Sequence, residues 1–307
     1  MASTTQPATF RSETNLMSQI KAVETRTAEA LIDGSPIYLS RTETMEAIYE
    51  AELHIAMNLP DDALYRLHNQ VYRTTVNGQD EYALPRGGVT APELDEYPMM
   101  RVLSVELDTG SGLTFCKLHN MTRFRELDSK GSDRASAQNP YATIYHQNLI
   151  VRPIPGTEAA DDKLRIRYVA VPRRRYKAYE GTTTSASSAS SVNDNGSGFG
   201  SGWFNNPSEV RTYLRWVDGA NAGKDHVVTA FSGTVFTVDP ALTGSVATGA
   251  KFDVGSVSDI GEEFSEMIVC YASAIILAAH KENGLAQMYF ELFFRSAQAV
   301  ASRYQFL

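Results

Sequence analysis

The stretch from Asn139 to Pro172, NPYATIYHQNLIVRPIPGTEAADDKLRIRYVAVP, constrains the fold more than any other part of the chain. It predicts three short β-strands, and the last of them alternates Leu164, Ile166 and Tyr168 with polar residues. The predicted strands cover Ala142–His146, Asn148–Pro153 and Lys163–Val171. The stretch carries no group that is suited to catalysis. A dense strand pattern without reactive side chains favours a structural protein over an enzyme.

Helical periodicity marks both ends of the chain. Ser12–Leu31 is predicted to be a helix that Ser12 or Thr14 caps, and Arg41–Asn58 a second helix that Pro60 ends. Near the C-terminus a helical stripe begins at Phe264, and Asn283-Gly284 is expected to stop or kink it. A further apolar stripe, from Leu285 to Tyr304, predicts the last helix.

Between these ends the apolar pattern changes to the period of strands. Asn77-Gly78 tolerates the positive φ of a tight turn, so a hairpin is predicted from Val71–Val76 and Glu81–Leu84. Met100–Asp108 is expected to pair with Leu113–Leu118. The polar segment Asn120–Lys130 is expected to hold a short helix.

The composition shifts abruptly from Gly181 to Pro207, where TTTSASSASSVNDNGSGFGSG offers little apolar surface to bury. Residues 181–202 are therefore predicted to form a loop that is more mobile than the flanking strands. A second group of strands is predicted after it. These strands cover Val210–Val217, His226–Ala230, Thr234–Val238 and Lys251–Val257.

Together these patterns predict an α+β fold in which N- and C-terminal helices form a bundle and an antiparallel β-rich module, a sandwich or a barrel, lies between them in sequence. The predicted helical domain covers 1–70 and 260–307, and the β module covers 71–175. Residues 176–259 are predicted to be a Ser/Gly-rich loop followed by a strand-rich insertion.

Charge and reactive side chains exclude several classes of function. The net charge of −8 argues against a large nucleic-acid surface, and the basic run Arg173–Arg175 with Lys177 is interpreted as a solvated loop. Cys116 and Cys270 lie far apart without metal-ligand spacing, so we expect no metal site and no disulfide scaffold. The glycines of Gly196–Gly202 lack the context of a phosphate loop. We expect no cofactor, no membrane segment, no signal peptide and no catalytic site.

Short motifs along the chain resemble the head-to-tail adaptor, or connector, proteins of tailed bacteriophages. After the helical start these motifs are Tyr82-Ala83-Leu84-Pro85, Tyr97-Pro98, Arg101-Val102-Leu103-Ser104-Val105, Asn139-Pro140-Tyr141, Leu149–Pro155 and Leu164–Val169, followed by the C-terminal helix from Glu262. The resemblance spans residues 13–175 and 260–304, and the insertion from about 176 to 258 departs from it.

The resemblance implies a structural virion protein that is made in the host cytoplasm and located in the neck between capsid and tail. Its relatives form homo-oligomeric rings, commonly of twelve copies, that dock beneath the portal protein. A tail or nozzle protein attaches on the other side, and genomic DNA passes through the centre. An acidic protein would not grip that DNA by charge, which suits a conduit without sequence recognition.

Two groups of residues are candidates for contacts in such an assembly. At the C-terminus, Arg303, Tyr304, Phe306 and Leu307 combine a cation with three large apolar groups, so we predict that they dock to the portal, although Tyr304 and Phe306 could equally close the helical core. In the insertion, Trp203, Phe204 and Trp216 are candidates for an interface or an anchor.

Two other functions compete with the adaptor hypothesis. The chain could be a tail, baseplate or decoration protein, in which the insertion would be the main functional part. Alternatively, it could be a hydrolase or a carbohydrate-binding module, which Trp203 and Trp216 would support. The terminal helices favour the adaptor over the first alternative, and the absence of convergent carboxylates favours it over the second.

Overall fold

A computed structural model describes residues 15–28, 40–86, 97–108, 112–129, 135–155, 160–175, 178–184, 190–194, 212–219, 221–232, 234–242, 244 and 246–304. The fold is mixed α+β, as predicted: helices from both ends of the chain pack together, and three sheets come between them in sequence. The chain divides into two compact units. Unit 1 comprises residues 1–59 and 172–307, and unit 2 comprises residues 60–171.

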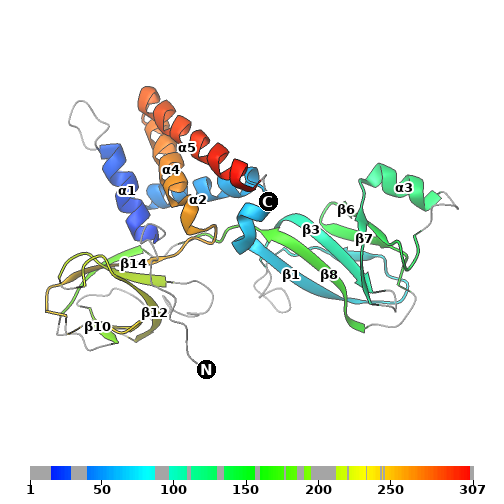
Figure 1. The fold of residues 1–307 in the computed structure, drawn as a ribbon, viewed down its shortest axis with the longest axis horizontal. Helices are drawn as coiled ribbons and strands as arrows, with labels where there is room; N and C mark the ends of the chain where they lie inside the picture. The colour runs from blue at the N-terminus through cyan, green and yellow to red at the C-terminus, as the bar shows by residue number, and fades with distance from the viewer. Residues whose placement is uncertain are drawn as a thin grey trace. The chain divides into compact units, whose positions relative to one another are not determined.

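Four helices build the helical part of unit 1: α1 (Leu16–Ala28), α2 (Arg41–Asn58), α4 (Ser265–Ala279) and α5 (Asn283–Tyr304). The apolar α4 is their centre, because α1, α2 and α5 all pack against it. In Figure 1, α4 and α5 run side by side and α2 crosses behind them.

The helix ends are set by local hydrogen bonds. Ser40 and Glu43 form a reciprocal capping box at the start of α2, and the helix ends before Pro60. The first helix was predicted to begin at Ser12 but begins at Leu16, where the side-chain oxygen of Asn15 accepts the backbone N–H of Met17 at 2.8 Å. The predicted caps Ser12 and Thr14 lie outside the described residues. Asn283 and Gly284 begin α5 and do not lie within a longer helix.

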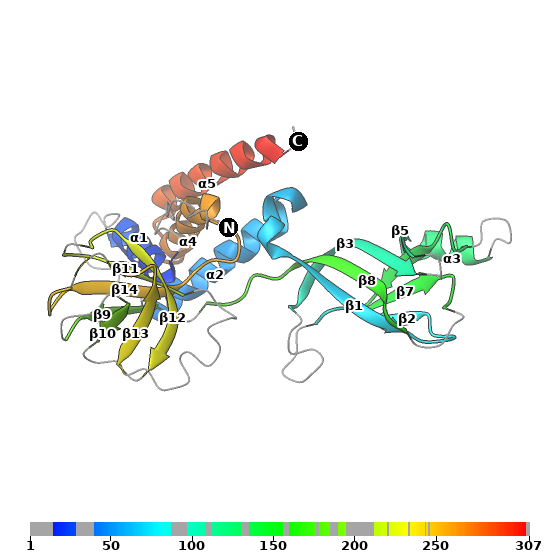
Figure 2. The same cartoon turned by 60° about the horizontal axis from the view of Figure 1, so that its bottom comes forward.

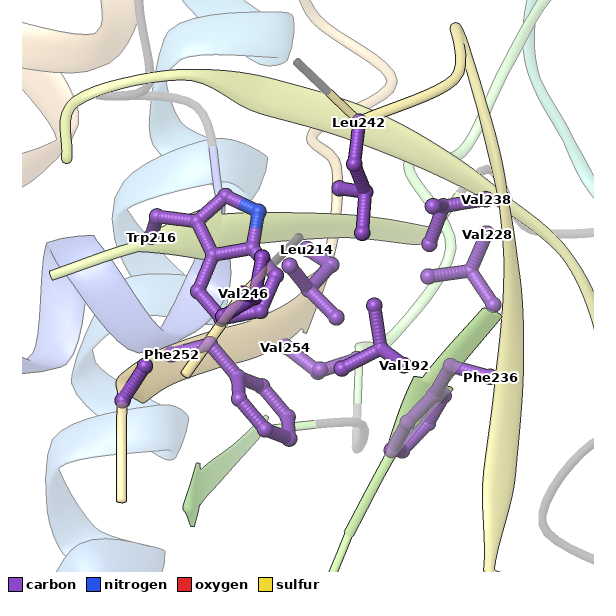
Figure 3. Close-up of a cluster of buried hydrophobic side chains, with 11 residues drawn as sticks. Val192, Leu214, Trp216, Val228, Phe236, Val238, Leu242, Val246, Phe252 and Val254 are labelled. Carbon is purple, nitrogen blue, oxygen red and sulfur yellow. The ribbon is translucent and has the colours of Figure 1, made fainter. Parts of the chain in front are cut away.

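A six-stranded antiparallel sheet completes unit 1, in the order β10-β13-β12-β11-β14-β9. Its strands are β9 (Ala178–Thr182), β10 (Ser191–Asn193), β11 (Thr212–Trp216), β12 (Asp225–Ser232), β13 (Val235–Asp239) and β14 (Lys251–Ser256). The sheet curves around a core that is contributed by every strand except the partly buried β9, as Figure 3 shows. Trp216, Phe236 and Phe252 are the largest side chains in that core, and all three are fully buried.

The described part of the Ser/Gly-rich segment contains strands that its composition does not predict. The loop predicted at 181–202 includes the end of β9 and all of β10, so the prediction of a loop was wrong for these residues. Val192 is fully buried in the sheet core, and Asp194 accepts the hydroxyl of Tyr179 at 2.7 Å. The strand is thus held by its pairing with β13, by the burial of Val192 and by the hydrogen bond of Asp194. Residues 185–189 and 195–211 lie outside the described residues.

Helix α1 joins the helices of unit 1 to the sheet. Asn15 forms a bridge to Val257, and Lys21 forms an ion pair with Asp253 at 2.7 Å. Gly255 in β14 is required by this close approach, because a Cβ atom there would lie 2.0 Å from the side-chain oxygen of Asn15. The helix and the sheet therefore form a single packed body.

Unit 2 contains two four-stranded sheets, in the orders β1-β8-β3-β4 and β2-β7-β6-β5 (Figure 2). The strands are β1 (His68–Thr75), β2 (Glu81–Ala83), β3 (Met99–Asp108), β4 (Leu113–Phe115), β5 (Lys117–Leu118), β6 (Tyr141–Tyr145), β7 (Asn148–Arg152) and β8 (Ala160–Ala170). Side chains of both sheets meet in one core that includes Val105, Leu149 and Ile166. The short 3-10 helix η2 (Asp61–Leu67) precedes β1, and the predicted short helix is α3 (Met121–Ser129).

The hairpin predicted at Asn77-Gly78 was wrong in its pairing. The turn is present, with Gly78 at φ 79°, but the strands on either side of it belong to different sheets. β1 pairs with β8 and β2 pairs with β7. The long register between β1 and β8 offers more cross-strand contacts than the three-residue β2 could supply.

Candidate interaction surfaces

Helix α5 carries apolar side chains on its surface. Its main helix contact within the described chain is with α4. Met288, Leu292 and Phe294 are 44%, 42% and 52% exposed, whereas Phe293 between them is buried. Exposed large apolar groups that repeat along one helix are typical of a surface that another protein covers.

A groove of about 250 Å³ runs between α2 and α4. Apolar side chains, among them Ala47, Ile275 and Ile276, form its floor. Glu43, Glu46 and Glu50 of α2 line it as well, and Thr42, Ala279 and His280 complete the lining. We call this feature the α2–α4 groove; it combines an apolar floor with an acidic rim.

An aromatic cluster joins α2, α4 and α5. His54 stacks on Tyr271, with 4.4 Å between the ring centroids, and both rings contact Phe293. Phe290 meets the edge of Tyr271 at 5.4 Å. Burial lowers the pKa of His54, so this imidazole is neutral at pH 7. Burial and the charge of Glu50 raise the pKa of Tyr271, and Glu50 also lines the groove.

The basic run after β8 is a structural clamp, and our interpretation of it as a solvated loop was wrong. Arg173 binds Asp259 through its backbone N–H and its guanidinium, with a shortest distance of 2.6 Å. Arg174 pairs with Glu46 and lies over the ring of Tyr49. The partners lie far away in sequence, which is why local composition could not reveal them.

Arg175 is the buried centre of this clamp. Its guanidinium forms an ion pair with Glu52 at 2.8 Å, and the two side chains are 3% and 1% exposed. The same guanidinium donates to the side chain of Gln19 at 2.7 Å and to the backbone carbonyl of Ser256 at 3.2 Å. Ser258 donates to Glu52. Arg175 therefore links α1, α2 and the end of β14.

The electrostatics of Glu52 reflect two opposed effects. Burial raises its pKa, while the charge of Arg175 and the hydroxyl of Ser258 act in the opposite direction. Removing both charges from water offsets much of the attraction between them. The main effect of the ion pair is therefore to fix one arrangement of the segments that it joins.

The structure places the sequence-predicted contact residues in different environments. Trp216 is fully buried among the core side chains of the six-stranded sheet, with Phe252 at 5.6 Å, so its side chain offers no surface to a partner. Arg303 is exposed at the end of α5. Trp203, Phe204, Phe306 and Leu307, and the side chain of Tyr304, lie outside the described residues.

Unit 2 has an exposed apolar surface that the sequence analysis did not identify. Phe115 in the edge strand β4 is 64% exposed, and Leu113 two residues earlier is also exposed. Ile144 and Tyr145 are exposed at the end of β6. Edge strands that carry large apolar groups are candidates for contacts with another chain.

The two cysteines are buried and free. Burial raises the pKa of the Cys116 thiol to about 12 and that of the Cys270 thiol to about 11. Among the residues that the structure describes, no group of three or more His, Cys, Asp or Glu side chains could hold a metal ion. No helix in the described part of the chain is long and apolar enough to cross a membrane.

The raised thiol pKa values lead to a direct prediction. At pH 8 the reactive thiolate fraction of both cysteines is far below that of a free cysteine, because a raised pKa keeps the thiol protonated. A thiol-specific colorimetric reagent should therefore leave the folded protein unlabelled and should label both cysteines in 6 M guanidinium chloride. Labelling of either cysteine within minutes in the folded protein would contradict the buried positions.

The fold and its exposed surfaces are typical of structural proteins that assemble with other chains. Helices from both chain ends form a body that carries a groove with an acidic rim and a helix with exposed apolar side chains. The comparison with protein families agrees, because the model of the SU10 adaptor protein family matches residues 19–195, more than half of the chain. The chain belongs to this family of phage adaptor proteins.

The matched region begins in α1 and ends just after β10. It thus covers all of unit 2 and the clamp Arg173–Arg175. A search of curated proteins gave no match. Adaptor proteins are structural, so family membership supports a non-enzymatic role in a virion.

Proposed function

We propose that the protein forms a ring that docks beneath the phage portal and joins it to the tail or tail nozzle. The observation that carries the proposal is helix α5, which leaves Met288, Leu292 and Phe294 uncovered while it packs along α4. The exposed apolar groups of this 22-residue helix, Met288 to Phe294, are stabilised when neighbouring copies cover them. The adaptor family supplies the biological setting for such copies.

A ring is the arrangement that suits this chain. Its subunits contact each other through two different surfaces, and such contacts close into a ring when the rotation between copies is a fraction of a full turn. Twelve copies is the number that the family resemblance implies. Genomic DNA would pass through the centre without sequence recognition, in keeping with the net charge of −8.

The C-terminal segment is proposed to bind the portal. Arg303 is exposed at the end of α5, and Tyr304, Phe306 and Leu307 follow it in sequence. Arg and large aromatic side chains are the groups that most often anchor protein interfaces. The tail or nozzle protein is then expected to bind elsewhere on the ring, and the exposed apolar edge of unit 2 around Phe115 is a candidate surface.

The proposal predicts assembly with the portal protein and its loss on truncation. Purified protein mixed with its cognate portal should give a larger ring-shaped particle in negative-stain electron microscopy. Deleting residues 303–307 should abolish that complex while the thermal melting temperature of the free protein stays unchanged. The matched control is Gln298→Ala, an exposed change on α5 outside the proposed contact, which should retain binding.

Two results would contradict the proposal. A virion map that places this chain outside the neck would exclude the adaptor position and favour a tail, baseplate or decoration protein. A large loss of stability in the deletion variant would show that the C-terminal residues close the helical core, and it would remove the claim of portal docking.

A further inference from the structure

The apolar side chains of α5 form two flanks that face different directions. Met288 and Leu292 are exposed and four residues apart, so they form one ridge along the helix, while Leu285 one turn earlier packs partly against Leu277 of α4. Phe294 lies two residues beyond Leu292 and therefore roughly 200° around the helix. Phe290 and Phe294 form the second flank, and Phe290 contacts Tyr271 of the aromatic cluster. The ridge and the Phe294 flank thus lie on different sides of α5.

The Phe294 flank continues the α2–α4 groove. His54 of α2 stacks on Tyr271 of α4, and Glu50 lies one helical turn before His54 on the rim of the groove. Ile275, on the groove floor, lies one turn after Tyr271. The groove and the aromatic cluster are consequently adjacent parts of one surface, which the ridge does not share.

The charges of the ridge and the groove are complementary. Arg295 is exposed and follows Met288 by seven residues, about two helical turns, so it lies beside the ridge. Among the described residues it forms one long ion pair, with Glu291 at 3.9 Å. On the groove rim, Glu46 is already paired with Arg174, whereas Glu50 forms no ion pair with any residue that the structure describes.

We propose that the α5 ridge of one copy packs into the α2–α4 groove of the next copy. Met288 and Leu292 would cover the apolar floor, and Arg295 would face the acidic rim. The contact uses two different surfaces, so every copy keeps one ridge and one groove available until the ring closes. This inference rests on the proposed ring and specifies the surfaces from which the ring is built.

Two variants test the ridge and the groove separately. The first, Met288→Glu with Leu292→Glu, places acids on the ridge, where they would meet the acidic rim of the neighbouring copy. The second, Glu50→Lys with Ala279→Lys, places cations in the groove, where they would meet the basic ridge. All four positions are exposed, so each variant should fold with an unchanged melting temperature. The controls are Gln298→Glu and Gln298→Lys, which make the same kinds of charge change at another exposed position of α5.

Assembly is measured by mass photometry, in solution and with the cognate portal. We expect the wild type and both controls to form the ring and each variant alone to remain monomeric. In an equimolar mixture, the intact ridge of the second variant fits the intact groove of the first. The mixture should therefore yield complexes that contain both variants and that neither variant forms alone.

The possible failures are distinguishable. If the wild type forms rings and both variants form them equally well, the ridge–groove contact is excluded and the proposed ring stands. If only the ridge variant fails and the mixture gives no complex of the two variants, the ridge packs against a surface other than the groove, and the ridge–groove contact is excluded. If the groove variant forms rings but loses the portal, the groove binds the portal. A wild type that forms no ring in either setting overturns the proposed function and this contact with it.

Discussion

Replacing Glu52 by alanine is expected to cost about 3–5 kcal/mol of folding free energy. The change leaves the guanidinium of Arg175, which is 3% exposed, without its carboxylate partner in the interior of unit 1. The loss is measured by urea denaturation followed by tryptophan fluorescence. Both tryptophans, Trp203 and Trp216, belong to unit 1, so this signal reports the unfolding of that unit alone.

A surface ion pair in the same clamp provides the matched control. Glu46→Ala removes the partner of Arg174, but both side chains of that pair are more than 40% exposed, so we expect a loss of about 0–1 kcal/mol. The double variant Glu52→Leu with Arg175→Met should recover part of the loss, because it leaves no buried charge. Equal effects of Glu52→Ala and Glu46→Ala would show that the clamp centre is not buried in solution.

Replacing Trp216 by alanine is expected to cost about 3–5 kcal/mol, because the change opens a cavity in the core of the six-stranded sheet. Trp216 is fully buried and contacts Phe252, and it is one of the largest side chains in this core. Far-ultraviolet circular dichroism during urea denaturation measures the change. The neighbouring Val217, just after the end of β11, is 47% exposed, so Val217→Ala should change stability by no more than about 0.5 kcal/mol.

This experiment also decides between the two roles that the sequence allowed for Trp216. A folded Trp216→Ala variant of unchanged stability that failed to bind a virion partner would restore the interface hypothesis and contradict the observed core. A destabilised variant supports the core position.

The sequence revealed those elements whose determinants are local. The bounds of α2 were predicted correctly, because the Ser40–Glu43 capping box and Pro60 set them within the helix itself. The strands β6 and β7 and the pairing of β3 with β4 were also predicted correctly, since strand patterns and a short turn specify them locally.

The errors arose where distant segments decide the structure. Asn77-Gly78 predicts a turn, but only the partners β8 and β7 determine that β1 and β2 belong to different sheets. β10 is held by Val192 within an otherwise polar segment, and its partner β13 lies far along the chain. The three arginines form ion pairs with acidic residues on α2 and after β14. No local sequence pattern links these acids to the arginines. The exposed α5 ridge was visible in sequence as an apolar stripe, but only the packing shows which part of it remains uncovered.

The register of β1 with β8 brings the two ends of unit 2 next to each other. His68 lies opposite Val169, so the first and last strands of unit 2 are neighbours in one sheet, and the ends of its chain leave from the same edge of the unit. A domain with adjacent ends can be inserted into a host domain without separating the host's own segments. Unit 2 therefore has the form of a cassette, which could be exchanged for another while the helices, the clamp and the groove of unit 1 stay unchanged.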